Sequence, residues 1–175
     1  FYNDYDHLLS MEQGTPLLGT LFASYLVFPL YFRNFFSDDN YGAEMAVDWR
    51  PLEKWRLQLA YSYLWSRPEQ QGWSPLNQIS LLSSWEIKND LEFDTWFYYI
   101  DRLNSLSTLS QLGIVSVDPY LNLTLRLAWR PRKDLELSLT GANLLDKSHL
   151  EYVQEAYTFP VEVQRSIYGQ VKWSF

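Results

Sequence analysis

Few residues in this sequence have the type and spacing that catalysis or metal binding requires. His149 and Glu151 form a His-x-Glu pair, which would ligate a metal ion only if strand geometry placed both side chains on one face. A serine hydrolase needs a nucleophile and a histidine at matched depth, and no serine is singled out by its spacing to His7 or His149. The chain has no cysteine and no glycine-rich phosphate loop. The sequence therefore predicts no catalytic residue, no metal site and no cofactor.

A larger group of polar residues occupies even-numbered positions in segments whose odd-numbered positions are apolar. This period of two places the polar and apolar sets on opposite faces of a β-strand. We expect the polar face to line water. Its members either contact a ligand or simply form solvated cross-strand pairs, and the second interpretation suits any single residue better. The predicted polar wall consists of Glu44, Asp48, Arg56, Gln58, Glu92, Asp94, Asn122, Arg126, Arg130, Glu136, Gln170 and Lys172.

The connections between the alternating segments also alternate in length. Short turns are expected at 51–54, 89–90 and 131–134, and long loops at 67–76, 101–119 and 145–164. Strand cores of about eleven residues match the 9–11 that a tilted strand needs to cross a bilayer. Tight turns at one edge and long loops at the other are typical of outer-membrane barrels. The sequence therefore predicts an all-β fold, an antiparallel up-and-down transmembrane β-barrel segment of about eight strands.

The first forty residues follow this pattern less closely. Residues 1–12 are strand-like, whereas 17–40 are expected to be a long connection, strand in part, that ends in a turn at 37–40. Residue 1 is Phe, and no secretory segment precedes it. We therefore expect the N-terminus of the natural protein to be missing from this sequence.

Aromatic residues make up 18% of the chain, and Trp and Tyr are favoured at membrane interfaces. No apolar run reaches the roughly 18–20 residues of a membrane helix. The net charge of -7 argues against nucleic acid as a partner. A membrane girdle with a role in assembly is expected at Trp49, Trp55, Trp85, Trp129, Trp173 and Phe175. Trp73, Tyr152 and Tyr157 lie in long loops and are candidate ligand contacts.

Several stretches resemble the C-terminal barrel of TonB-dependent outer-membrane receptors. They are FYNDYDHLLS (1–10), YGAEMAVDW (41–49), LQLAYSYL (57–64), LRLAWRPRKDLELSLTGANLLDKSHLEY (125–152) and RSIYGQVKWSF (165–175). The most specific part is GANLLDK (141–147), followed by a strand that ends in aromatic-Ser-Phe. The resemblance implies a location in the outer membrane of Gram-negative bacteria and uptake of a scarce ligand, typically a ferric siderophore or cobalamin.

The resemblance also implies that the chain is the last third of a barrel of about 22 strands. We expect residues 1–175 to form one barrel segment, without the N-terminal plug, the TonB box and the earlier strands. The implied partners are outer-membrane lipid, those missing parts, the TonB complex acting through them, the barrel-assembly machinery and a small-molecule ligand.

Two alternatives remain open at this point. An open sheet leaves backbone groups unpaired in lipid, so either the missing strands complete the barrel or the first and last strands pair. In the second case the chain would be a self-contained eight-stranded barrel with a structural or adhesion role. Trp96, Tyr98 and Tyr168 would then help to fill its interior. A small outer-membrane enzyme is the other alternative.

Overall fold

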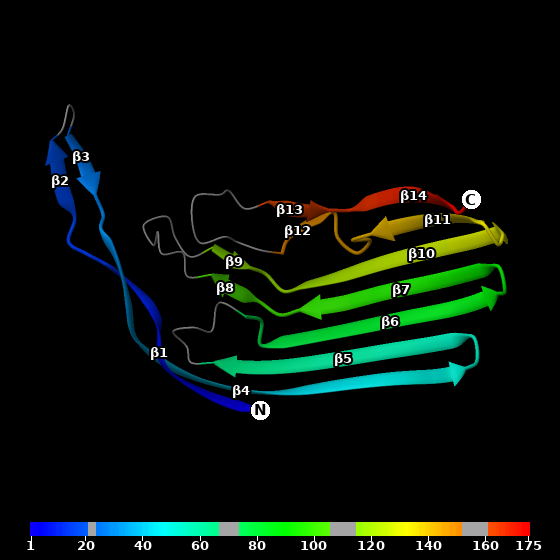
Figure 1. Cartoon of the computed structure of the whole chain (residues 1–175), viewed down its shortest axis with the longest axis horizontal. Coiled ribbons are helices and arrows are strands. Elements are labelled where there is room, and N and C mark those ends of the chain that lie inside the picture. The colour runs from blue at the N-terminus through cyan, green and yellow to red at the C-terminus, as the bar shows by residue number, and fades with distance from the viewer. Residues whose placement is uncertain (21–23, 67–73, 106–114, 152–160) are drawn as a thin grey trace. The chain divides into compact units, whose positions relative to one another are not determined.

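The structure is a computed structural model that describes residues 1–20, 24–66, 74–105, 115–151 and 161–175. All regular structure in these ranges is β-strand (Figure 1). The first four strands are β1 (Tyr2–Gln13), β2 (Leu17–Thr20), β3 (Ser24–Val27) and β4 (Leu30–Leu52). The next five are β5 (Trp55–Ser66), β6 (Asn77–Lys88), β7 (Leu91–Ile100), β8 (Leu103–Ser105) and β9 (Val115–Val117). The last five are β10 (Tyr120–Arg132), β11 (Leu135–Ala142), β12 (Ser148–Leu150), β13 (Glu162–Gln164) and β14 (Ser166–Trp173). None of the described residues belongs to a helix long and apolar enough to cross a membrane.

Eight of these strands form one sheet in the order β1-β4-β5-β6-β7-β10-β11-β14. Sheet neighbours follow one another along the chain as in an up-and-down meander. Three neighbouring pairs, β1–β4, β7–β10 and β11–β14, each enclose one short strand pair, which is β2–β3, β8–β9 and β12–β13 respectively. The pairs β2–β3, β8–β9 and β12–β13 are separate antiparallel hairpins. The predicted fold, an antiparallel up-and-down sheet of about eight strands, is confirmed.

The chain divides into two compact units, Phe1–Tyr41 and Gly42–Phe175. In the first unit, β1 pairs with the beginning of β4, from Gln13↔Leu30 to Tyr2↔Tyr41. His7 has a φ of 61° and lies where the β1–β4 register shifts, which is the geometry of a β-bulge. The second unit contains the rest of β4 and the strands from β5 to β14.

Two expectations about the connections are wrong. Residues 37–40 are not a turn, because β4 runs through them and Asp38 and Asp39 face Tyr5 and Asp4 across the ladder. Pairing with a distant strand overrides the local turn preference of Asp and Asn. The long loops at 101–119 and 145–164 are also not free of strands, because they contain β8, β9, β12 and β13. The short turns lie at 53–54, 89–90 and 133–134, within or at the predicted positions.

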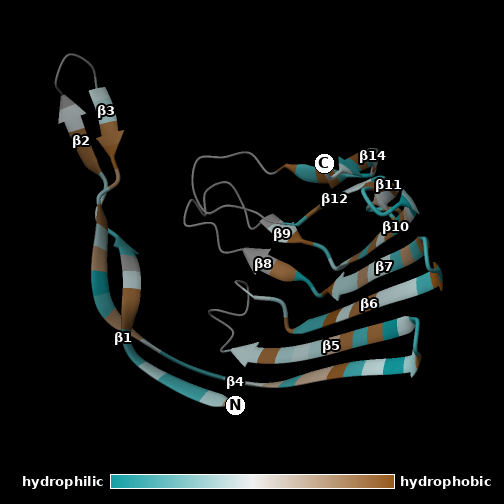
Figure 2. Cartoon of the chain, turned by 45° about the vertical axis from the view of Figure 1, so that its right-hand side comes forward, coloured by the Kyte–Doolittle hydropathy of each residue, from teal (hydrophilic) through white to brown (hydrophobic). Residues whose placement is uncertain are grey.

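Among the described residues of the second unit, most of the buried side chains are polar, and many apolar side chains are exposed. In β5, β6, β7, β10, β11 and β14, no odd-numbered position carries a charge, and Figure 2 shows hydrophobic and hydrophilic residues alternating along the strands. Among the described residues, Val117 and Ala128 are the buried apolar side chains, whereas Asp94, Asn122 and Thr140 are buried polar ones. Odd-numbered Leu127 and Leu139 are 44% and 57% exposed. This arrangement is the reverse of a water-soluble sheet.

Candidate functional site

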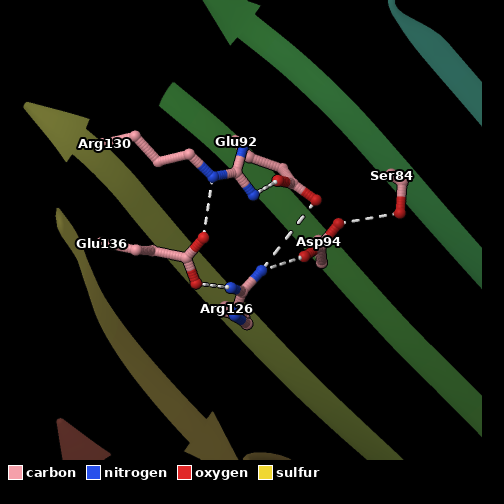
Figure 3. A network of polar contacts seen from close by, with 6 residues as sticks. All are labelled: Ser84, Glu92, Asp94, Arg126, Arg130 and Glu136. Carbon is pink, nitrogen blue, oxygen red and sulfur yellow. Dashed lines mark hydrogen bonds and ion pairs between the residues drawn. The ribbon is translucent and has the colours of Figure 1, made fainter. Parts of the chain in front are cut away.

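A network of charged side chains on three neighbouring strands occupies part of the even face (Figure 3). Arg126 on β10 lies opposite Asp94 on β7, because the register pairs the two residues directly. Its Nη1 donates to Asp94 Oδ2 at 2.8 Å, and its Nη2 donates to Glu136 Oε1 at 2.7 Å. Ser84 Oγ on β6 donates to the other oxygen of Asp94 at 2.8 Å. Asp94 is only 3% exposed, and burying a carboxylate is costly unless partners such as these pair with it.

Arg130 extends the same network toward the short turns. Its Nε donates to Glu136 Oε2 at 2.7 Å, and its Nη2 donates to Glu92 Oε2 at 2.5 Å. Glu136 on β11 therefore bridges two guanidinium groups. Lys172 on β14 faces Glu136 in the register. With Lys172 included, the three carboxylates meet three cations, so the network is close to neutral.

A second pair lies on β4 and β5. The Arg56 guanidinium contacts both oxygens of Asp48, and Gln58 Nε2 donates to Asp48 Oδ2 at 3.4 Å. The Arg56 and Asp48 side chains are 44% and 47% exposed, so solvent screens their attraction. This pair keeps the even face polar but contributes little to the stability of the fold.

A third cluster joins β7 and β10 to the segment that follows β11. Glu151 Oε1 accepts from the Tyr98 hydroxyl at 3.0 Å and lies 3.1 Å from His149 Nε2. The His149 ring stacks on Tyr120 with 4.3 Å between ring centroids. His149 Nδ1 lies 3.4 Å from Asp146 Oδ2, so each ring nitrogen faces a carboxylate. These contacts fasten residues 146–151 to the polar face.

The proposed His-x-Glu pair, His149 and Glu151, thus forms part of a side-chain cluster. Among the residues that the structure describes, no group of three or more His, Cys, Asp or Glu side chains is arranged to hold a metal ion.

The remaining predicted wall residues also lie on the even face. Glu44 borders an open depression of about 650 Å³ that is also lined by Ala60, Ser80 and Tyr98. Asn122 faces Tyr98 of the third cluster across the β7–β10 ladder. Asn122 is 6% exposed, and its Oδ1 has no partner within the described ranges. Gln170 faces Ser138 across the β11–β14 ladder.

The predicted girdle tryptophans all lie on the odd face near the short turns. Trp55 faces Trp85 in the register, with 6.4 Å between their ring centroids. Trp129 and Trp173 donate their indole N–H groups to Asp90 and Asp134. Phe175 is fully exposed. The candidate ligand contacts Trp73, Tyr152 and Tyr157 lie outside the described residues.

Sequence reasoning missed the geometry of the segment after β11. Asn143 is 1% exposed, has a φ of 52° and donates its side-chain amide to Val163 O at 3.1 Å. A Cβ on Gly141 would lie 3.0 Å from Leu144 Cδ2, so glycine lets Leu144 fold back over the strand end. In the sequence, the Gly-Ala-Asn-Leu run is distinguished only by its resemblance to the receptor family. The local signal for this geometry is the residue types, because Gly and Asn are the residues that best tolerate positive φ and close packing.

Outer-membrane receptors of known structure contain a similar sheet. The Ferric-Catecholate import receptor Fiu from E. coli K12, in its open form, matches with a TM-score of 0.69 and 15% identity, over 78% of this chain and 21% of that chain. The siderophore receptor PirA from Acinetobacter baumannii matches with a TM-score of 0.67 and 16% identity, over 99% of this chain and 28% of that chain. The ferripyoverdine receptor of the outer membrane of Pseudomonas aeruginosa matches with a TM-score of 0.67 and 16% identity, over 94% and 24%.

This chain therefore spans about a quarter of the length of each of these receptors. At such low identity the likeness establishes the fold, which is that of the strand wall of siderophore receptors. No protein-family model and no curated protein matches the sequence.

Proposed function

We propose that this chain is part of the wall of an outer-membrane TonB-dependent transporter that takes up a scarce ligand such as a ferric siderophore. The observation that carries the proposal is the absence of charge from the odd face of β5, β6, β7, β10, β11 and β14, together with the ion network on the even face. A sheet with one uncharged face and one polar face suits a wall between lipid and a wet lumen. The fold shared with siderophore receptors supports the same assignment.

In this proposal the odd face contacts lipid of the Gram-negative outer membrane, and the even face lines the lumen. The short turns lie on the periplasmic side, with Trp49, Trp55, Trp85, Trp129, Trp173 and Phe175 in the interfacial girdle. The long loops lie outside the cell, where Trp73, Tyr152 and Tyr157 are the proposed ligand contacts. The barrel-assembly machinery would act on the aromatic-ended last strand.

The chain acts as one segment of a larger receptor. Because it spans 21–28% of the receptors above, we assign the rest of the barrel and the plug to parts of the protein outside this sequence. Coupling to the TonB complex would run through those parts. The proposed role is transport rather than catalysis, in keeping with the import and siderophore receptors that share the fold.

Uptake by the complete receptor tests this function. Iron-starved cells with and without the receptor gene are given a panel of radioactive ferric siderophores, with labelled cobalamin as a further ligand. We expect at least one ligand to enter only when the receptor is present. Unchanged uptake of every ligand, with the receptor abundant in the outer membrane, would contradict the proposal. Heat-modifiable migration of residues 1–175 alone on a gel would instead support the self-contained eight-stranded barrel.

A further inference from the structure

The three short turns share a hydrogen bond that no local sequence rule requires. The backbone carbonyl of the second residue of each turn accepts a hydrogen bond from an amide near the end of the next strand along the sheet. Glu86 N donates to Lys54 O at 2.8 Å, Arg130 N to Asp90 O at 2.7 Å, and Ser174 N to Asp134 O at 2.9 Å. The contact is therefore a repeated feature of this edge of the sheet.

Two of these contacts are reinforced by a tryptophan. The residue before the donating amide is Trp129 in one case and Trp173 in the other. Trp129 Nε1 donates to Asp90 Oδ2 at 3.1 Å, and Trp173 Nε1 donates to Asp134 Oδ2 at 3.2 Å. A carboxylate is a stronger acceptor than a neutral oxygen. Arg132 donates to both oxygens of Asp134, at 3.0 and 2.8 Å, which orients that carboxylate toward the indole.

The third turn provides an internal contrast. Trp85 precedes the donating amide of Glu86, as Trp129 precedes Arg130, but the turn residue is Lys54, whose side chain has no acceptor. Within the described ranges, the Trp85 indole has a ring contact with Trp55 and no hydrogen bond. The backbone contact is present here without the side-chain contact.

We propose that Asp90 with Trp129, and Asp134 with Trp173, act as turn clamps that hold each of these two turns to the next strand of the sheet at the short-turn edge. The physical need for them follows from the connectivity. Strands within a hairpin are joined covalently at this edge, but β7 and β10, like β11 and β14, are joined only through the long connection at the other edge. The clamps hold together strand ends that the chain leaves unconnected.

The Asp134 clamp acts on β14, which pairs with β11 in the second unit. It adds a side-chain contact to the β11–β14 ladder at the end of β14 near the short turns. The clamps do not depend on what the receptor transports.

Amide hydrogen exchange in the complete receptor in lipid nanodiscs tests the clamps one at a time. In Trp173→Phe and in Asp134→Ala, we expect the Ser174 amide to exchange about tenfold faster or more, since a hydrogen bond to a charged group is lost. The Arg130 amide, in the other clamp, should not change. Trp129→Phe should accelerate exchange of the Arg130 amide and leave exchange of the Ser174 amide unchanged. The Ser174 amide should exchange no faster in the double variant Trp173→Phe/Asp134→Ala than in Asp134→Ala alone. Unchanged exchange at Ser174, or equal acceleration at both amides, would overturn the proposal.

A gain-of-function variant keeps the proposal testable if these losses prevent assembly. Lys54→Asp supplies the missing acceptor for Trp85, and Lys54→Ala is its matched control because both remove the contact between the Lys54 amine and Asn89. We expect the Glu86 amide to exchange several-fold more slowly in Lys54→Asp than in Lys54→Ala. Equal exchange in the two variants would overturn the role assigned to the carboxylate.

Discussion

The two units of this chain combine the same secondary structure with two different distributions of charge. In Gly42–Phe175, charge is restricted to one face of the sheet strands, and the other face is apolar and exposed. In Phe1–Tyr41, both faces are mixed. Asp38 and Asp39 are successive residues and lie on opposite faces of β4, and Leu17 and Leu18 on β2 are 58% and 68% exposed. Strand pairing and a two-faced side-chain pattern are thus separate properties of this chain.

The length of β4 supports the same distinction. This strand has 23 residues, about twice the 9–11 that a membrane-crossing strand needs. Its residues 42–52 follow the two-faced pattern, and its residues 30–41 do not. The side-chain pattern of β4 thus changes near the boundary between the two units. The first unit also contains the Arg33–Glu12 ion pair, in which both side chains are at least half exposed.

The two units also differ in how they accommodate a buried aspartate. Asp94 in the second unit is 3% exposed and is bonded to Ser84 and Arg126. Asp38 in the first unit is 4% exposed, and its Oδ1 has no partner in the described part of the chain. Burying a charge is costly unless it is paired. The second unit offsets this cost through its network, and at Asp38 the first unit does not.

The largest effect on stability is expected when Asp94 loses the cation that distinguishes it from Asp38. Arg126→Met leaves Asp94 buried without its cation and should lower the free energy of unfolding by about 3–5 kcal/mol. Asp38→Asn should leave stability unchanged or raise it by about 1 kcal/mol, because it removes an unpaired buried charge. Urea unfolding of the complete receptor in vesicles measures both. Destabilisation by Asp38→Asn comparable to that by Arg126→Met would show that Asp38 has an essential partner.

A smaller effect is expected from a charge on the apolar faces. Leu127→Arg places a cation on the odd face in the middle of β10 and should cost about 2–4 kcal/mol if that face meets lipid. Leu18→Arg, on the exposed β2–β3 hairpin, should change stability by no more than about 0.5 kcal/mol. Urea unfolding and the fraction of receptor recovered in the outer membrane are the measurements. Equal damage from both substitutions would place the first unit in lipid as well.

The smallest effect concerns the loop end of β7. The Asn77 side-chain amide donates to Asp101 at 2.9 Å, and the Arg102 backbone amide donates at 2.9 Å. With the Asn77 hydrogen bond as the main cause, the pKa of Asp101 lies below its ordinary value. A carboxyl with a depressed pKa stabilises the fold above its unfolded value of about 4, and this stabilisation disappears as the pH falls through the folded pKa.

Asp101→Asn should therefore lower stability at neutral pH by about 0.5–1.5 kcal/mol, the usual contribution of a hydrogen bond. The difference from the wild type should vanish in acid. Urea midpoints at neutral pH and at a series of acid pH values below the ordinary Asp pKa of about 4 provide the comparison. A difference that persists in acid would mean that Asp101 contributes through packing rather than charge.

The sequence by itself determined which residues share a face. The alternation of Leu121, Leu123 and Leu125 with Asn122 and Thr124 is a local property, because successive side chains of any strand point to opposite sides. The short turns and the row of tryptophans beside them were also predictable, since they depend on neighbouring residues. Repetition of this pattern along the chain was sufficient to predict the up-and-down sheet.

Only the tertiary structure decided which of these residues meet. Arg126 contacts Asp94, which is 32 residues away in the sequence, because the β7–β10 register places the two residues opposite each other. The turn-like residues 37–40 became part of β4 because β1 supplied a partner for their backbone. Cross-strand pairing depends on residues distant in the chain, so the strand pattern could be predicted from the sequence but the networks and clamps that join the strands could not.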